Sequence, residues 1–354
     1  MQGNELVVDE SRGHRRWSDG REWLITLILG IFVVALAAVS LVLGQFPIEP
    51  GDALLMIVHK IAPAAVDPTW TAQQESIFFN VRLPRILLAL MVGCSLATAG
   101  AAFQGTFQNP LVSPDILGAS QGAAFGAAVA ILIGLSSLMV SVCAFVVSLI
   151  TVALVVLIST RARGNQILVV VLAGVMVSSL FSAGVSYTKL IADPNDTLPA
   201  ITYWLMGSVA SAKMSDIELV AIPMALGLVT LFLLRWRINI LTMGDDEAAT
   251  MGVNARRTRA VIMVAATLVT ASSVAVTGMI GWVGLVIPHL ARMLVGADYR
   301  KLMPASMIMG AGFLLLVDDI ARLAATMEIP IGILTAFVGA PFFVYLITRG
   351  RKRS

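Results

Sequence analysis

Charged residues are scarce in this chain of 354 residues: they make up 13% of it, while apolar residues make up 58%. About a quarter of an ordinary soluble domain is charged, so this composition excludes a soluble protein. Mean hydropathy is +0.89. Several apolar runs are also about 20 residues long, which is enough for a helix to cross the hydrocarbon core of a bilayer. We therefore expect an all-α polytopic protein of the inner membrane.

Cysteine and histidine are almost absent, with two and three copies. Cys94 and Cys143 fall inside apolar runs and no CxxC pair occurs, so we expect packing residues, and neither a disulfide nor a metal site. The sequence also lacks the GxxxxGK(S/T) loop that binds nucleotide phosphates, and the HExxH and GxSxG motifs of hydrolases. These absences predict a chain without catalytic residues, metal or cofactor of its own.

Ten transmembrane helices are expected from the apolar runs, in a domain over residues 23–348 between a polar, basic tail at 1–22 and a basic tail at 349–354. Lys and Arg gather in alternate segments between the runs. This bias indicates that both termini are cytoplasmic, and it explains the net charge of +3 without a nucleic-acid partner. A half-length apolar piece at 201–210 is expected at the outer boundary. The spans are expected at residues 23–43, 82–107, 119–134, 137–159, 167–191, 217–234, 260–279, 284–294, 302–326 and 331–347.

Glycine and proline mark a faint internal repeat. Gly100 precedes Pro110 by ten residues and Gly278 precedes Pro288 by ten, each near the end of a span that opens a block of four. The two blocks begin on opposite sides of the membrane, an inverted repeat that is common in transporters. Within the second block, the glycine-rich run 278–292 predicts a broken, partly re-entrant helix beside a path through the membrane.

The longest charged stretch between spans covers residues 235–259, and within it the segment 241–259 joins three acids to an arginine-rich end. The acids at 245–247 suit the positive N-terminal end of a short helix, which Gly252 would end. The arginines that follow would serve equally well to set topology from a solvated loop. Exposed Ala248, Ala249 and Met251 favour instead a docking surface for a cytoplasmic partner.

Three charged residues, Asp318, Asp319 and Arg322, fall inside the ninth span. Spacings of three and four place Arg322 on the helical face of both acids, so a pair within the helix forms easily. Charges inside a span are costly and usually face protein or water. One interpretation is a self-neutralised pair near the outer end. The other is that Arg322, together with Arg82, presents charge at an external mouth.

Several longer motifs occur in one order along the chain: RLPR at 82–85, GAAFQGTFQNPLVSPDILGAS at 100–120, MGDDEAATMGV at 243–253, IGWVGLVIPHLAR at 280–292 and IPIGILTAFVGAPFF at 329–343. With them the chain resembles the FecCD-type permease subunits of iron-siderophore, haem and vitamin B12 ABC importers. The resemblance implies a type II ABC importer permease of ten helices. It also implies three kinds of partner: a second permease copy, two cytoplasmic ATPase subunits that bind ATP and Mg, and an extracytoplasmic substrate-binding protein.

The resemblance assigns roles to individual residues. It matches Arg82 and Arg322 to external arginines that meet acidic residues of the binding protein. It places the cytoplasmic gate at Gly164, Asn165 and Gln166, where relatives often carry small hydroxyl residues. The coupling segment that contacts the ATPase comprises Gly244, Asp245, Asp246, Glu247, Ala248, Met251 and Gly252. Structural or path-lining roles are expected for Gln104, Asn109, Pro110, Gly281, Gly284, Pro288, His289, Gly339 and Pro341.

Import of a ferric siderophore or related metal chelate across the inner membrane is the function that this resemblance implies. Haem and cobalamin permeases share the same motifs, so the sequence does not determine the chelate. It also does not distinguish a homodimer of permeases from a heterodimer. Two functions of other classes stay open: a secondary transporter driven by an ion gradient, and a membrane anchor in a larger complex.

Overall fold

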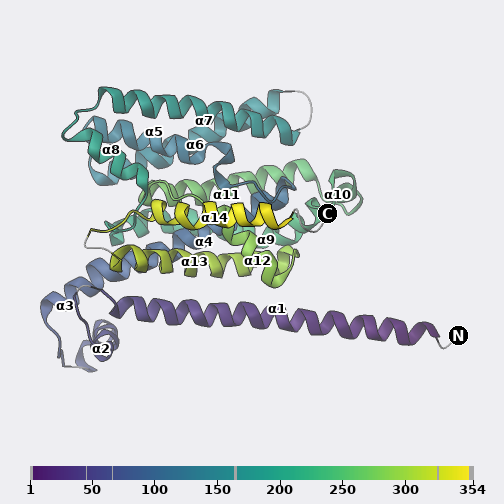
Figure 1. The fold of residues 1–354 in the computed structure, drawn as a ribbon, viewed down its shortest axis with the longest axis horizontal. Coiled ribbons are helices and arrows are strands. Elements are labelled where there is room, and N and C mark those ends of the chain that lie inside the picture. The colour runs from purple at the N-terminus through teal and green to yellow at the C-terminus, as the bar shows by residue number, and fades with distance from the viewer. Residues whose placement is uncertain (1–2, 45, 66, 163–165, 325–326, 351–354) are drawn as a thin grey trace.

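The computed structural model of the protein describes residues 3–44, 46–65, 67–162, 166–324 and 327–350. This part of the chain consists of helices and their connections and contains no strand (Figure 1). Two short 3₁₀ helices are η1 (Pro63–Ala65) and η3 (Pro114–Leu117), and η2 (Phe78–Arg82) is a π-helical segment. The helices are α1 (Gly3–Val42), α2 (Pro50–Ile61), α3 (Ala72–Ile77), α4 (Leu83–Thr106), α5 (Ala119–Leu132), α6 (Ser137–Arg161), α7 (Gln166–Ile191), α8 (Thr197–Met206), α9 (Met214–Leu241), α10 (Asp245–Thr250), α11 (Ala255–Thr277), α12 (Val283–Val295), α13 (Tyr299–Leu323) and α14 (Ile331–Gly350).

Each of the ten predicted spans coincides with a helix, so the all-helical polytopic fold is confirmed. Among the described residues, seven helical stretches are long and apolar enough to cross a bilayer: α1, α3 continued through η2 into α4, α6, α7, α9, α11 and α13. The shorter apolar helices are α5, α12 and α14. Helix α1 begins at Gly3, so the polar N-terminal segment continues the first span as one helix.

Burial separates central helices from peripheral ones. In the apolar stretches of α4 and α11, 78% and 72% of the residues are buried, against 11% in α1. The central packing depends on glycine. A Cβ added at Gly100 of α4 would lie 1.8 Å from the carbonyl oxygen of Gly284 in α12, and one at Gly93 would lie 2.2 Å from that of Gly310 in α13. Backbones approach this closely in membranes because small residues leave room for van der Waals packing.

Helix contacts fit the predicted inverted repeat. Helix α4, the first of the first block, contacts α12 and α13 of the second block. Helix α11, the first of the second block, contacts α5 and α6 of the first. If the helices from α4 to α7 are matched in order to those from α11 to α14, the two sets of contacts exchange, as a pseudo-twofold axis requires.

The two ends of the bundle differ in what they carry. One end, which we call the terminal end, holds α10, the start of α1 and the end of α14 (Figure 1, right). The opposite end, the α2 end, holds α2, α3 and the half-length helix α8 (Figure 1, left). The segments expected in the cytoplasm and those expected outside therefore lie at opposite ends of one bundle.

Candidate coupling segment and charge cluster

Glycines define both ends of α10 at the terminal end of the bundle. Gly244, which precedes the helix, has φ +124°, and a Cβ there would lie 2.4 Å from Oε2 of Glu247. Gly252, which follows the helix, has φ +74°, a left-handed conformation that glycine adopts without strain. Asp245, Asp246 and Glu247 occupy the first turn, where negative charge is favourable. The predicted short acidic helix and its glycine end are thus present.

A bidentate ion pair fixes α10 to the spans. Nη1 and Nη2 of Arg259, in α11, donate to the two carboxylate oxygens of Asp245 at 2.7 and 2.5 Å. Nε of Arg259 also donates to the carbonyl oxygen of Thr106 at the end of α4, at 3.3 Å. The hydrogen bonds from Arg259 hold the pKa of Asp245 below its usual value. The buried Arg259 side chain therefore ties the coupling segment to the two most central helices.

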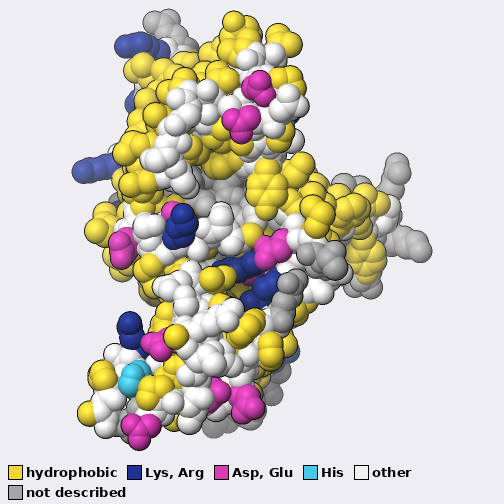
Figure 2. Space-filling model, turned by 90° about the vertical axis from the view of Figure 1, so that its left-hand side faces the viewer, with side chains coloured by type: hydrophobic (Ala, Val, Ile, Leu, Met, Phe, Trp, Pro, Cys, Tyr) yellow, Lys and Arg dark blue, Asp and Glu magenta, His cyan; other side chains and the backbone are white. Residues whose placement is uncertain are grey.

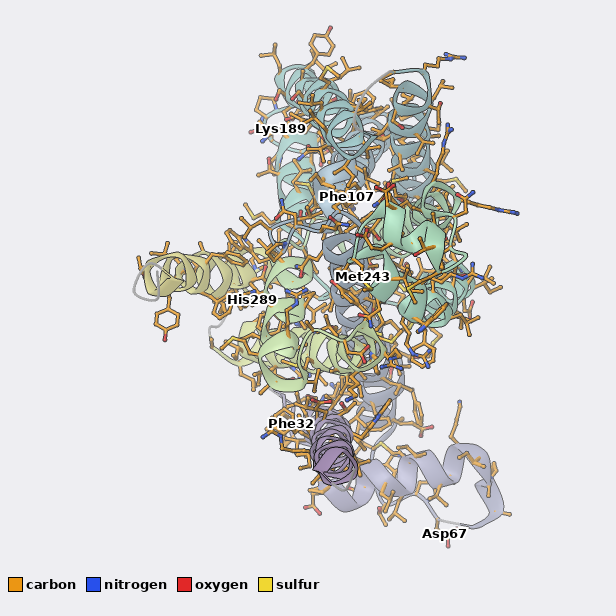
Figure 3. The ribbon with its side chains drawn as sticks, turned by 90° about the vertical axis from the view of Figure 1, so that its right-hand side faces the viewer. Phe32, Asp67, Phe107, Lys189, Met243 and His289 are labelled. Atoms are coloured by element: carbon orange, nitrogen blue, oxygen red, sulfur yellow. The ribbon has the colours of Figure 1, made fainter. Side chains whose placement is uncertain are left out.

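Only part of the coupling segment is available to a partner. Asp246, Glu247 and Ala249 are exposed, as is half of Met251. Ala248 is fully buried, so its predicted exposure is wrong: the residue points inward and packs in the core with α9 and α11. Figure 3 looks onto the terminal end, where Met243, 61% exposed, lies near the middle. The result is an acidic surface with exposed methionines on a rigidly held turn.

Arg82, at the α2 end, is directed into the protein. Its Nη1 donates to the carbonyl oxygens of Leu41 and Val42, both at 2.8 Å, and its Nη2 donates to that of Phe46. A cation at the C-terminal end of α1 is favourable because the last carbonyls of a helix lack partners within it. Gly44 leaves room for this contact, since a Cβ there would lie 2.5 Å from Nη2.

The two adjacent acids of α13, Asp318 and Asp319, pair with two different arginines. Arg85 of α4 makes a bidentate contact with Asp318, with Nη2 to Oδ1 and Nε to Oδ2 both at 2.9 Å, and also reaches Glu328 at 2.8 Å. Arg322 pairs with Asp319 at 2.5 Å. The predicted pair within the ninth span is therefore confirmed, between Asp319 and Arg322. Asp318, the other acid, neutralises a buried arginine of the neighbouring helix.

Helix α1 joins the same cluster through Ser40. Its hydroxyl donates to Asp319, and its carbonyl oxygen accepts from Nη2 of Arg322 at 3.2 Å. Arg82 is 4% exposed and Arg322 7%. Neither guanidinium reaches the surface of the chain as it stands, so docking through them stays a prediction that requires both to exchange partners inside the protein.

The predicted path residues fall into separate places. Gln104 is buried and bridges helices: its Nε2 donates to the carbonyl oxygen of Leu285 at 3.4 Å, and its Oε1 accepts from Arg292 at 3.1 Å. Gly284 lies against Pro114, since a Cβ added to this glycine would be 2.5 Å from Cδ of the proline. Asn109 and Pro110 instead form an exposed turn, in which the side chain of Asn109 accepts from the backbone of Leu111.

A second group of these residues lies between α12 and α14. The ring of His289 meets that of Phe342 edge-on at 6.1 Å. Gly339 lies under Trp282, where a Cβ would come within 2.5 Å of the indole, and Trp282 itself has φ +72°. Pro288 and Pro341 lie inside α12 and α14, while Gly281 faces open space. Of the predicted gate, Gly164 and Asn165 lie outside the described residues, and Gln166 begins α7.

Some functional contacts carry no signal in one sequence. Arg259 looked like one of several topology-setting arginines, because its partner lies 14 residues earlier and beyond a turn. Arg85 and Asp318 are 233 residues apart.

Comparison with known protein families identifies the family of this chain. The model of the FecCD transport family matches residues 31–349. The chain belongs to the FecCD transport family. As a FecCD protein it is the permease of an ABC importer, a multi-pass membrane subunit, and the resemblance drawn from its motifs is confirmed.

Similar proteins cover most of this FecCD chain. The molybdate import permease MolB of Haemophilus influenzae is 40% identical over 325 residues, 91% of this chain and 95% of MolB. The hemin transport permease HmuU of Yersinia pestis is 40% identical over 287 residues, 78% of this chain and 84% of HmuU. Further relatives are named as permeases for cobalamin and iron(3+)-hydroxamate. A solved structure, described as an inward-facing conformation of a metal-chelate type ABC transporter, is 40% identical with a TM-score of 0.80, over 92% of this chain and 99% of the other.

Proposed function

We propose that this permease is the conduit of an ATP-driven importer that moves a ferric siderophore or related metal chelate across the inner membrane. Two ATPase subunits would dock at the terminal end, which would then be cytoplasmic. A binding protein would deliver substrate at the α2 end. A second copy of the chain would complete the path. Family membership and the predicted topology support this assembly.

The observation that carries the proposal is the way α10 is held. Its acidic first turn and Met251 are exposed, while Ala248 and the Asp245–Arg259 pair fasten it to α9, α11 and the end of α4. A force applied to the exposed side of α10 would therefore reach the most buried helices directly. This is the property that a coupling element needs when the nucleotide-binding engine is a separate chain.

The exposed surface of α14 favours a second copy of the chain at that side of the bundle. Helix α14 lies at one side of the bundle, where it contacts α8, α12 and α13 (Figure 3). Phe337 is 74% exposed and Val344 63%. Beside it, an apolar hollow of about 670 Å³ is lined by Met206, Met279 and Pro341 together with other residues of α8 and α14. A twofold partner would cover these side chains, and a wide apolar wall suits a bulky chelate selected beforehand by the binding protein.

Reconstitution tests whether ATP hydrolysis by the separate subunits drives import through this chain. The chain is placed in proteoliposomes with its ATPase subunits and loaded binding protein, and uptake is measured with ATP, with a non-hydrolysable analogue, and with the chain alone. Uptake only with ATP is expected. A secondary transporter would instead carry substrate with the chain alone and lose that activity when the ion gradient is collapsed. A membrane anchor would show no uptake defect on deletion.

Molybdate is a second candidate substrate, because MolB is as similar to this chain as the haem permease is and matches more of it. A deletion strain supplied with single iron sources, and separately limited for molybdenum, distinguishes the two. Loss of growth on a ferric siderophore alone supports the chelate. A defect confined to low molybdenum supports the oxyanion and removes the iron proposal.

A further inference from the structure

Helix α2 carries a stripe of large aliphatic side chains that the described chain leaves at least partly exposed, from 37% at Ile57 and Val58 to 80% at Ile61. Leu54, Ile57, Val58 and Ile61 recur at the spacing of one helical face, and all four are exposed, Leu54 at 64% and Ile61 at 80%. By contrast, the covered apolar side chains of α2 are Ala53 and Met56. An exposed stripe of this kind marks an interaction surface.

The position of α2 sets the depth at which its stripe lies. Met56 and Ala53 pack in a small core with Ile48, Trp70 and Phe78, and Leu41 and Val42 of the last turn of α1 pack against this core. Because α1 is a membrane span, its last turn marks the edge of the hydrocarbon region. Helix α2 therefore lies at the boundary between hydrocarbon and headgroups.

The direction of α2 differs from that of the spans. In Figure 1 the spans run across the picture while α2 is seen nearly end-on. In Figure 3, turned by 90°, α1 is seen end-on and the segment after it runs sideways, away from the bundle, toward Asp67. Helix α2 thus lies roughly in the plane of the bilayer and beyond the footprint of the other spans, where lipid surrounds the protein.

The polar side of α2 faces away from the stripe. At 100° per residue, Asp52 and His59 lie opposite Ile57 and Ile61. Asp52 accepts a hydrogen bond from the hydroxyl of Thr69 at 2.8 Å, and His59 meets the ring of Trp70 edge-on at 5.7 Å, so the loop after α2 covers this side. Figure 2 views the α2 end from outside and shows acidic and histidine side chains over the region of α2 and α3. The aliphatic stripe is therefore turned toward the bilayer.

We propose that α2 is an interfacial helix that rests on the bilayer at the α2 end, with Leu54, Ile57, Val58 and Ile61 inserted among the lipid headgroups and upper acyl chains. Apolar side chains are also exposed where α1 ends, at Val39 in α1 and at Leu43 just after it. Lys60 keeps its ammonium group over the ring of Phe79, 5.4 Å from the centroid, at the edge of the buried side. An apolar face set against a polar one is the pattern of helices that lie in this zone. The outcome would be an anchor that holds the loop before α4, and with it Arg82, at a fixed height.

Site-directed fluorescence tests the proposal in the full chain reconstituted in nanodiscs. In a Cys94→Ala/Cys143→Ala background, Ile57→Cys and Ile61→Cys are labelled with an environment-sensitive dye, with Gln73→Cys in the exposed part of α3 as control. We expect blue-shifted emission at positions 57 and 61, quenched several-fold more by lipids that carry a nitroxide near the headgroup than by a water-soluble quencher. The control is expected to show the reverse.

Two outcomes overturn the proposal. One is aqueous quenching at positions 57 and 61 equal to that at position 73. The other is a blue shift that appears only after addition of the binding protein, or only in a dimer, since either assigns the stripe to a protein partner. If the cysteine variants do not fold, the unaltered chain is irradiated with a phospholipid that carries a diazirine near its headgroup. Crosslinks within residues 50–61 are expected, and their absence also overturns the proposal.

Discussion

At the scale of single residues, the charges of this permease are placed to join helices. Arg259 connects α11 to Asp245 and to the end of α4, while Arg85 connects α4 to α13. Arg82 and Ser40 connect the end of α1 to the same region. In a membrane, ionisable groups are retained where they pair with one another or with backbone carbonyls. Here each pair also fixes the relative height of two helices.

Asp245→Asn is expected to loosen α10. The substitution removes a charge from the pair and leaves the buried Arg259 without its counter-ion. Since the Asp245 side chain is 60% exposed, the loss in free energy of unfolding should be about 1 kcal/mol, and the larger effect should be on ATPase stimulation by the binding protein. Asp246→Asn, on the exposed side of the same turn, is the control for stability. Equal melting temperatures of the two variants would contradict this role of the pair.

The Asp245–Arg259 pair should also make the stability of the protein depend on pH, in a direction that follows from the pKa of Asp245. Because folding lowers the pKa of Asp245, its contribution to stability is fully present above the unfolded pKa of about 3.9 and is lost as the pH falls through the lower folded value. The difference in stability between the unaltered chain and Asp245→Asn should be constant from neutral pH to about pH 5 and shrink in stronger acid. Unfolding measured against pH for both proteins checks this. A difference that grows on acidification would contradict it.

Asp318→Asn is expected to be much more damaging than Glu328→Gln, although both acids contact Arg85. Asp318 and Arg85 are buried, with side chains 1% and 5% exposed, whereas Glu328 is 37% exposed. Breaking a buried pair costs about 3–5 kcal/mol because a charge is left without compensation, and an exposed one costs about 1 kcal/mol or less. Equilibrium unfolding in mixed micelles measures both. Similar losses in the two variants would show that Arg85 does not depend on Asp318.

At the scale of helices, the lengths of the apolar runs and the glycines, prolines and charged residues between them were sufficient to locate all ten spans, α8 and α10. Each of these features is local in sequence, and a bilayer forces the backbone of a lipid-facing span to be helical. The contacts between helices were not predictable in the same way. These contacts depend on how each helix is rotated about its axis and how far it is shifted along its neighbours. No short sequence pattern encodes that rotation and shift. Examples are the contact of Gly100 with Gly284, the pairing of Asp318 with Arg85, and the inward direction of Ala248.

Gly100→Ala tests the contact between α4 and α12. The added methyl would lie 1.8 Å from the carbonyl oxygen of Gly284, so the two helices must separate. We expect a loss of about 1–3 kcal/mol in the free energy of unfolding, as for overpacking of a core. Gly30→Ala in α1 is the matched control, since the nearest atom to its Cβ would be 4.0 Å away. Folded yield and unfolding midpoint of the two variants are compared. A neutral Gly100→Ala would mean that α4 and α12 are less closely packed.

At the scale of the whole molecule, the bundle has a central pair of helices, α4 and α11, and very unequal flanks. Helix α1 is anchored to the centre through its charged α2 end, although only 11% of its apolar stretch within residues 20–42 is buried. Helix α14 is held by fewer features: Gly339 under Trp282, Phe342 against His289, and Gly332 against the backbone of Met206. Both flanks expose apolar side chains, but the α14 flank also borders the apolar hollow beside Pro341, which suits a subunit whose α14 side is completed by a partner.

Cysteine crosslinking measures whether that partner is a second copy. A closed dimer has a twofold axis, so a residue near the axis faces its own counterpart. In the Cys94→Ala/Cys143→Ala background we expect Phe337→Cys or Val344→Cys in α14 to form a crosslinked dimer in native membranes with a short bifunctional thiol reagent. Leu233→Cys in α9 is equally apolar and 69% exposed, but lies on another helix, and is expected to stay monomeric. Equal crosslinking of Leu233→Cys and the α14 variants would indicate random collision and remove α14 from the interface. If α14 crosslinks only to a different permease, the assembly is a heterodimer, and the hollow beside Pro341 is then completed by side chains of that other chain.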